Sequence, residues 1–351
     1  MSAHPAPPPG ADALFVRKTL IVIGLVALVW LIWQLRDVLL MVFGAIVIAT
    51  LFQSLAQQFE RLRIHQGVAL LLSVLTVVII VGVGLALFGK QLFDQAEEIR
   101  AALPQAWAAL KERLATVGLD GQLEQFGKGG ASGSLAANAG QWVMSLGSGL
   151  ADALLIVVGG VFIAASPRFY RAGIMKMVPE HRRGLIGDAL ADTGKALRLW
   201  LRAQLLTMAV VGFATGIGLW LIGMESALAF GLLAALLEFI PFVGPILSAV
   251  PAVLIAAATN PELALWVAGV YFIVQQLEGY LFSPLLQQWA VDLPGAVMLF
   301  SLLAMGTLFG PLGIVFAAPL TVVVYVLVKR LYVREALHTK TEIPGEDVHL
   351  H

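Results

Sequence analysis

The sequence contains no cysteine among its 351 residues, and only 13% of them are charged, 22 basic and 22 acidic. The absence of cysteine excludes disulfides, thiolate metal sites and cysteine nucleophiles. The low charge excludes two water-soluble domains, because a soluble protein normally carries about 25% charged residues. The balanced charge gives no indication of nucleic-acid binding. The sequence also lacks an H-E-x-x-H zinc motif and a G-x-x-x-x-G-K-[ST] phosphate loop, so it gives no basis for a zinc enzyme or a nucleotide hydrolase.

Hydrophobic residues make up 59% of the chain. They fall in runs long enough for membrane-crossing helices, which need about 20 residues, rather than for β-barrel strands. The predicted fold is therefore an all-α polytopic membrane protein with about six full transmembrane helices and two broken or re-entrant helical hairpins in its C-terminal half. The predicted organisation is a disordered tail (1–13), three transmembrane helices (14–89), an extracytoplasmic amphipathic helical insert (90–147), a transmembrane helix (148–167), a basic cytoplasmic amphipathic segment (168–203), a transport core (204–330) and a cytoplasmic tail (331–351).

Two apolar runs in the C-terminal half, 226–258 and 296–328, are longer than one crossing needs. Both contain proline and glycine near their middles. Proline removes a helix donor and clashes with the preceding turn, and a neighbouring glycine lets the backbone reverse. We therefore expect two broken hairpins, with a pair of kinked, tilted helices as the alternative. The predicted breaks are Pro241, Gly244 and Pro245 in the first run and Gly310, Pro311 and Gly313 in the second.

The positions of the basic residues predict an orientation, because lysine and arginine collect on the cytoplasmic side of membrane proteins. With a cytoplasmic N-terminus and two hairpins, most of the 22 basic residues fall on that side, and so does the C-terminus. The first hairpin then enters from outside and the second from the cytoplasm, as in inverted-repeat transporters. We interpret the basic segment 168–203 as an in-plane helix attracted to anionic lipid, with a substrate- or partner-binding role as the alternative.

Ionisable side chains at membrane depth are the most informative candidates for function, because they are costly in hydrocarbon and usually face a cavity or pathway. Glu238 lies one turn before Pro241, and Glu278 lies in the densest polar cluster of any predicted span. A carboxyl group in such surroundings can exchange a proton or accompany a cation near neutral pH. For Glu278 and Gln204 a purely structural hydrogen bond is the alternative. The candidate transport and coupling residues are Glu278, Glu238, Gln275, Gln276 and Gln204.

Three motifs occur in order along the C-terminal half. Residues 231–252 include Glu-Phe-Ile-Pro-Phe-Val-Gly-Pro, residues 275–279 read Gln-Gln-Leu-Glu-Gly, and residues 308–313 read Leu-Phe-Gly-Pro-Leu-Gly. In these motifs and in the order of its spans and insert, the chain resembles the autoinducer-2 exporter-like (AI-2E) family of bacterial permeases. The resemblance covers roughly residues 14–335. Tyr280 stands where many members of that family have asparagine, which leaves the choice of substrate open.

The resemblance implies a secondary transporter of the bacterial inner membrane that is not an enzyme and needs no cofactor. It implies export of the quorum-sensing signal autoinducer-2 or a related small polar solute by ion-coupled alternating access, with H+ or Na+ as the coupling ion. Sodium(lithium)/proton antiport through the same carboxyl groups is one alternative. A non-transporting membrane scaffold that binds a partner through 90–147 or 168–203 is another. A homo-oligomer, such as a pentameric ring, is also expected.

Overall fold

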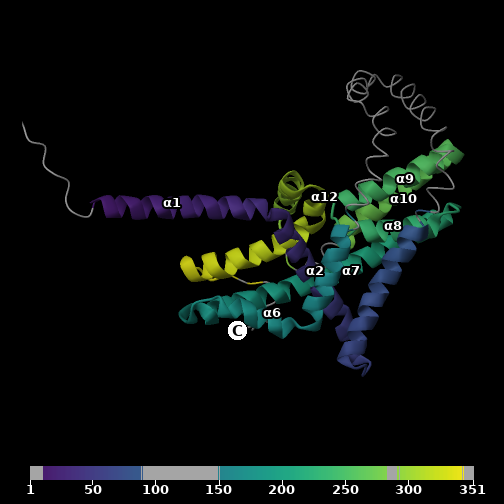
Figure 1. Ribbon diagram of the computed structural model, residues 1–351. Helices are drawn as coiled ribbons and strands as arrows, with labels where there is room; N and C mark the ends of the chain where they lie inside the picture. The colour runs from purple at the N-terminus through teal and green to yellow at the C-terminus, as the bar shows by residue number, and fades with distance from the viewer. Residues whose placement is uncertain are drawn as a thin grey trace, which may run out of the picture.

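The computed structural model describes residues 11–87, 89, 149, 151–282, 291, 293–341 and 343, and every regular element within these residues is a helix (Figure 1). In chain order they are α1 (Ala11–Gln34), α2 (Arg36–Arg61), the unlabelled helices Gln66–Leu87 and Ala151–Ala165, α6 (Pro167–Lys176), η1 (Glu180–Arg182), α7 (Arg183–Leu221), α8 (Ala227–Leu237), α9 (Val243–Thr259), α10 (Pro261–Leu277), the π-helical turn η2 (Glu278–Phe282), α12 (Gly295–Leu327) and the π-helical segment η3 (Val328–Ala336).

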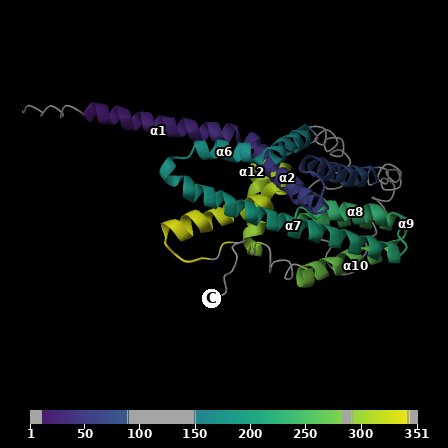
Figure 2. The ribbon, with the colours of Figure 1, turned by 90° about the horizontal axis from the view of Figure 1, so that it is seen from below.

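Five of these helices are long and apolar enough to cross a membrane, and a sixth span is present if one bent pair of helices is counted as a single crossing. The prediction of an all-helical, multi-pass membrane protein is confirmed at this level for the described residues. The predicted insert, 90–147, lies outside them. α1 begins at Ala11, inside the segment predicted to be a disordered tail, and projects away from the other helices (Figures 1 and 2).

The basic segment 168–203 is divided between two helices. The helix Ala151–Ala165 is followed by α6 after a bend of 88°. α7 then begins at Arg183 and runs for 39 residues without interruption, so its basic first half continues directly into an apolar second half. In that first half Arg202 contacts α2, donating hydrogen bonds to Ser54 (3.1 Å) and Gln57 (2.8 Å). The in-plane orientation of this segment stays a prediction.

α8, α9 and α10 gather with the end of α7 at the opposite end of the molecule from α1 (Figure 2). A shared apolar cluster joins them, with Leu219 from α7, Phe230 from α8, Ile255 from α9 and Val267 from α10 all buried. α10 starts sharply because the side chain of Asn260 accepts a hydrogen bond from the amide of Glu262 (2.9 Å), and Pro261 occupies the first turn, where no helical donor is needed.

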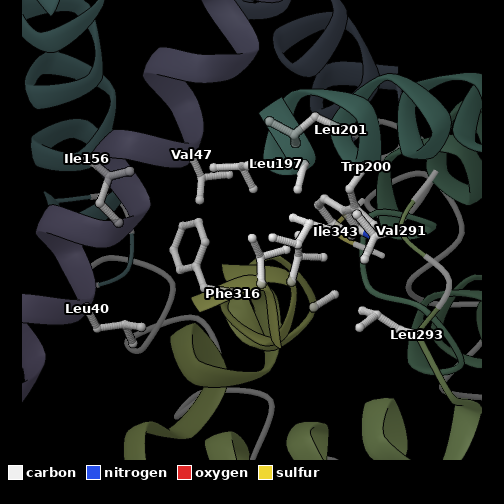
Figure 3. Packing of buried hydrophobic residues seen from close by; sticks show 14 residues of the cluster. Leu40, Val47, Ile156, Leu197, Trp200, Leu201, Val291, Leu293, Phe316 and Ile343 are labelled. Atoms are coloured by element: carbon white, nitrogen blue, oxygen red, sulfur yellow. The ribbon is translucent and has the colours of Figure 1, made fainter. Parts of the chain in front are cut away.

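A second apolar cluster lies where α2, α7 and α12 meet (Figure 3). Val47 of α2, Leu201 of α7 and Phe316 of α12 are buried in it. Phe43 packs edge-on against Phe316, with ring centroids 6.4 Å apart. This cluster ties the N-terminal helices to the second of the two broken runs.

Both long apolar runs reverse direction at or beside the predicted glycines and prolines. In the first, the backbone carbonyl of Leu237 lies so close to Gly244 that a Cβ at 244 would overlap it. In the second, Gly310 has φ 63° and ψ −146°, and a Cβ at Gly313 would overlap the carbonyl of Met305. Residues eight positions apart lie far apart in a continuous helix, so the chain turns back at Gly310 within α12. That these hairpins enter the membrane from opposite sides stays a prediction.

Candidate functional site

Three segments that are distant in the sequence bring polar side chains together. Glu238 directly follows α8, and its amide still donates to the carbonyl of Ala234 (2.9 Å). Beyond α10 the chain widens into the π-helical turn that starts at Glu278, and such turns occur frequently at functional sites. Gln204 comes from the middle of α7. The first break, the end of α10 and the long helix α7 therefore meet at one place.

These side chains are linked by hydrogen bonds. The amide nitrogen of Gln204 donates to the backbone carbonyl of Glu238 (2.6 Å), and that of Gln275 donates to the Glu278 carboxyl group (2.8 Å). Glu238 and Glu278 line the same cavity, so their two carboxyl groups are neighbours. Two carboxylates at close range repel each other, and one proton held between them relieves that repulsion. The pair is therefore a natural place to hold a single proton.

Glu238 is the most deeply enclosed of these groups, with only 1% of the residue exposed. Its Oε2 atom finds no hydrogen-bond partner among the described residues. Leaving a buried polar atom unpaired costs about 1–3 kcal/mol. Such an atom is well suited to a bound solute or ion that supplies the missing contact.

A cavity of about 250 Å³ opens between these side chains. It is large enough for several water molecules or one small polar solute, since a water occupies about 30 Å³ in the liquid. The described residues that line it are Trp200, Ala203, Gln204, Thr207, Glu238, Pro241, Phe242, Gln275, Glu278, Gly279, Val291, Leu293, Gly295 and Met298.

The rim of the cavity includes a strained turn. Phe242 has φ 65° and ψ −37°, and the amide of Val243 donates to the carbonyl of Pro241 (2.8 Å) across it. This is a γ-turn of the rare kind, and holding a residue other than glycine in this region costs about 1–3 kcal/mol. Strain of this kind collects at binding and switching sites.

The structure places the other candidate residues elsewhere. Gln276 is exposed and lines a separate shallow groove with Ile273 and Tyr280. No residue of the second break, 309–314, is among the described residues that line the polar cavity. Instead, Phe309 and neighbouring side chains of that break pack against the apolar cluster of α2, α7 and α12.

Several lining residues were not among the sequence candidates. Thr207 and Trp200 lie three residues after and four residues before Gln204, so helical periodicity around that glutamine would have found them. Val291 and Leu293 had no such signal, because they lie outside the described helices and reach the cavity only through the tertiary fold.

Two other hollows of the described structure are less suited to ion coupling. One, about 840 Å³, is lined by apolar and small residues of Gln66–Leu87, α7 and α8. Another, about 410 Å³, lies among exposed amides near Gln53 and His65. Among the described residues no three histidine, aspartate or glutamate side chains are grouped closely enough to hold a metal ion.

The model of the AI-2E transporter family matches residues 20–332 of this chain. The chain belongs to the AI-2E family. Its polar cavity and both interrupted runs fall within the matched residues. As a member of a family of transporters and permeases with several membrane-length helices, the protein is a multi-pass membrane protein.

Individual relatives agree with this membership. The AI-2 transport protein TqsA of Escherichia coli K12 is 24% identical over 302 residues, which are 82% of this chain and 84% of TqsA. The candidate transport protein YhhT of the same strain is 25% identical over 292 residues, 81% of this chain and 82% of YhhT. YrrI of Bacillus subtilis 168 is 35% identical over 138 residues, 39% of each chain. The match thus spans only about two-fifths of YrrI and of a second Bacillus subtilis relative, YueF.

Proposed function

We propose that this AI-2E family protein is an ion-coupled secondary transporter of the bacterial inner membrane that exports a small polar solute of the autoinducer-2 type. The single observation that carries the proposal is the polar cavity, which holds two carboxyl groups at a helix break within an otherwise apolar chain. Charged groups in such surroundings are typical of substrate and ion pathways. The name of TqsA, an AI-2 transport protein, supports the choice of cargo.

The mechanism follows from the chemistry of the pair. With one proton between them, Glu238 and Glu278 carry one negative charge instead of two, which lowers the cost of holding them in an apolar environment. Loss of that proton leaves two negative charges at close range, which favours either a cation in the cavity or a conformation open to water. Gln204 and Gln275 keep the two acids in position through their hydrogen bonds. Protonation would thereby bias an alternating-access equilibrium.

The test is accumulation of labelled autoinducer-2 in everted membrane vesicles. Glu278→Gln, which keeps the shape and removes the titratable proton, should lower the accumulation rate at least about tenfold, a change of about 1.4 kcal/mol in barrier height. Glu225→Gln is the matched control, because this carboxyl group is exposed in the turn before α8. Accumulation at the unaltered rate in Glu278→Gln would refute the role of the pair.

Sodium(lithium)/proton antiport is the second candidate, and the acid pair also favours it, because one site could hold either a proton or a cation. A sodium-evoked pH change in the same vesicles, abolished by Glu278→Gln and present without autoinducer-2, would identify antiport. Signal export instead requires accumulation of the labelled solute without a sodium-evoked pH change.

Orientation, assembly and membrane contacts are part of the same proposal. Cytoplasmic termini follow from the basic residues, and a homo-oligomeric ring would cover apolar α1, whose membrane-length window has none of its residues buried. Native mass spectrometry measures the subunit number, and a monomer in lipid nanodiscs would contradict the ring.

The alternative of a non-transporting scaffold predicts the opposite result to a transporter: deleting 90–147 abolishes function, whereas Glu278→Gln and Pro241→Ala leave it intact.

A further inference from the structure

The chain beyond η3 folds back on itself. The amide of Leu337 donates to the carbonyl of Tyr332 (2.9 Å), and that of Thr339 to the carbonyl of Val333 (3.1 Å). His338 between them has φ 50°, the left-handed conformation that turns a chain sharply. We call residues 337–341 together with Ile343 the C-terminal strap.

The strap ends in the interior of the protein. Only 3% of Ile343 is exposed, and it belongs to the same buried cluster as Trp200, Val291 and Leu293. Figure 3 shows its side chain beside Trp200 and Val291. Burial of an isoleucine side chain strongly favours this docked position over a tail free in water.

The three residues that Ile343 joins are cavity residues. Trp200, Val291 and Leu293 all line the polar cavity that contains Glu238 and Glu278. Trp200 belongs to α7, whereas Val291 and Leu293 lie outside the helices. Val291 and Leu293 are not in helices, so the buried side chains around them, including Ile343, help to hold them in place.

The base of the strap is fixed to α7, which carries part of the cavity wall. Arg330 in η3 lies 3.5 Å from Asp188 and 3.6 Å from Asp192, both on α7. α7 also carries Trp200 and Gln204. The strap therefore links one part of α7, through Arg330, to the buried side chains behind Val291 and Leu293.

We propose that the C-terminal strap closes the polar cavity on the side of the membrane where the C-terminus lies, and that undocking of Ile343 opens the cavity to that side. The proposal rests on the proposed function in taking this cavity as the transport site. It adds the gate on one side and the segment of the chain that forms it.

A single reporter cysteine tests the gate, because the chain contains no other cysteine. Thr207→Cys places a thiol in the cavity wall. The rate of labelling by a membrane-impermeant maleimide is measured in everted and in right-side-out vesicles, and a C-terminal epitope tag reports which preparation exposes the tail. With Ile343→Ser, the labelling rate should rise about tenfold in the preparation that exposes the tail and stay unchanged in the other.

Leu337→Ser is the matched control, because this strap residue is 54% exposed and its labelling rate should stay at the original value. Ile343→Val, which removes one methylene group, should give a small rise on the same side and remains informative if Ile343→Ser does not fold. An unchanged rate in the folded Ile343 variants, or an equal rise in both preparations, would overturn the gate. Labelling requires no transported solute, so this result is independent of the Glu278→Gln transport test.

Discussion

The two interrupted runs look alike in sequence but differ in their surroundings. The first break, between α8 and α9, lines a polar cavity and carries Glu238 with an unpaired carboxyl oxygen. The second break, at Gly310, packs Phe309 and its neighbours into the apolar cluster of α2, α7 and α12. A broken helix in a membrane protein is therefore not a site by itself, because the polar groups around it decide whether it can receive a solute.

The two breaks also differ in how they accommodate the reversal. The second uses glycine at the position with φ 63°, where a side chain would be strained. The first places Phe242 at φ 65° and accepts the strain. Strain that glycine would have relieved is retained at the break that lines the cavity, as expected where two conformations of similar energy are needed.

The largest effect is expected at the glycines where the two halves of each hairpin approach each other most closely. Gly244→Val and Gly313→Val each push a side chain into the backbone of the facing half, and we expect a loss of about 3 kcal/mol or more in each. The measurement is the folded fraction that remains after heating in detergent, by size-exclusion chromatography. Gly269→Val is the control, because nothing lies within 4 Å of a Cβ there. Loss in only one variant would mean that only one run is a tight hairpin.

The next largest effect separates stability from transport. Gly310→Ala forces a Cβ into the left-handed region and should cost about 1–3 kcal/mol of stability. Since this break does not line the polar cavity, transport per folded molecule should remain near its original value. The comparison requires thermal stability and vesicle transport on the same preparation. A tenfold loss of transport per folded molecule would place the second break in the pathway.

At the first break, Glu238→Leu should have the opposite effect to Gly310→Ala: stability is kept and transport is lost. Replacing a buried, partly unpaired acid by an apolar residue of similar size should leave stability unchanged or raise it, because the desolvation cost disappears. Transport should fall about tenfold or more, equivalent to about 1.4 kcal/mol. A variant that unfolds while transport per folded molecule persists would show that the acid is structural.

The smallest effect concerns the strained turn. Phe242→Gly should raise stability by about 1 kcal/mol, because relief of strain outweighs the added freedom of the unfolded chain at this half-exposed residue. Thermal midpoints in detergent measure the gain, with Phe239→Gly as a control that removes a partly buried ring packed on Trp200 and should lose stability. A lower midpoint for Phe242→Gly would show that the turn is not strained.

Much of the fold could be predicted from composition and local sequence. Membrane helices require long apolar runs, and breaks require residues that cannot continue a helix, so both interruptions were predicted at Pro241 and Gly310 or beside them. The extent of α7 was not predictable in this way. Its basic first half is a separate segment by composition, but packing against α2 keeps it in one helix with the apolar second half.

The candidate site was predictable only where local chemistry is sufficient. Glu238, Glu278, Gln275 and Gln204 meet at the cavity because burial of polar groups requires partners. Gln276 differs from Gln275 only in the face of α10 that it occupies, which is set by tertiary packing. The contribution of Ile343 was not visible either, since Val291, Leu293 and Trp200 are distant from it in the sequence and only the tertiary fold brings them together.

The length of α7 has a mechanical consequence. Its 39 residues extend for roughly 58 Å, nearly twice the thickness of the hydrocarbon layer. One stiff rod thus passes from Asp188 and Asp192, where η3 is attached, past Gln204 to its packing against α8. A small tilt of this rod at the end held by η3 would be transmitted along its length, so a force applied outside the bilayer could widen or narrow the polar cavity inside it.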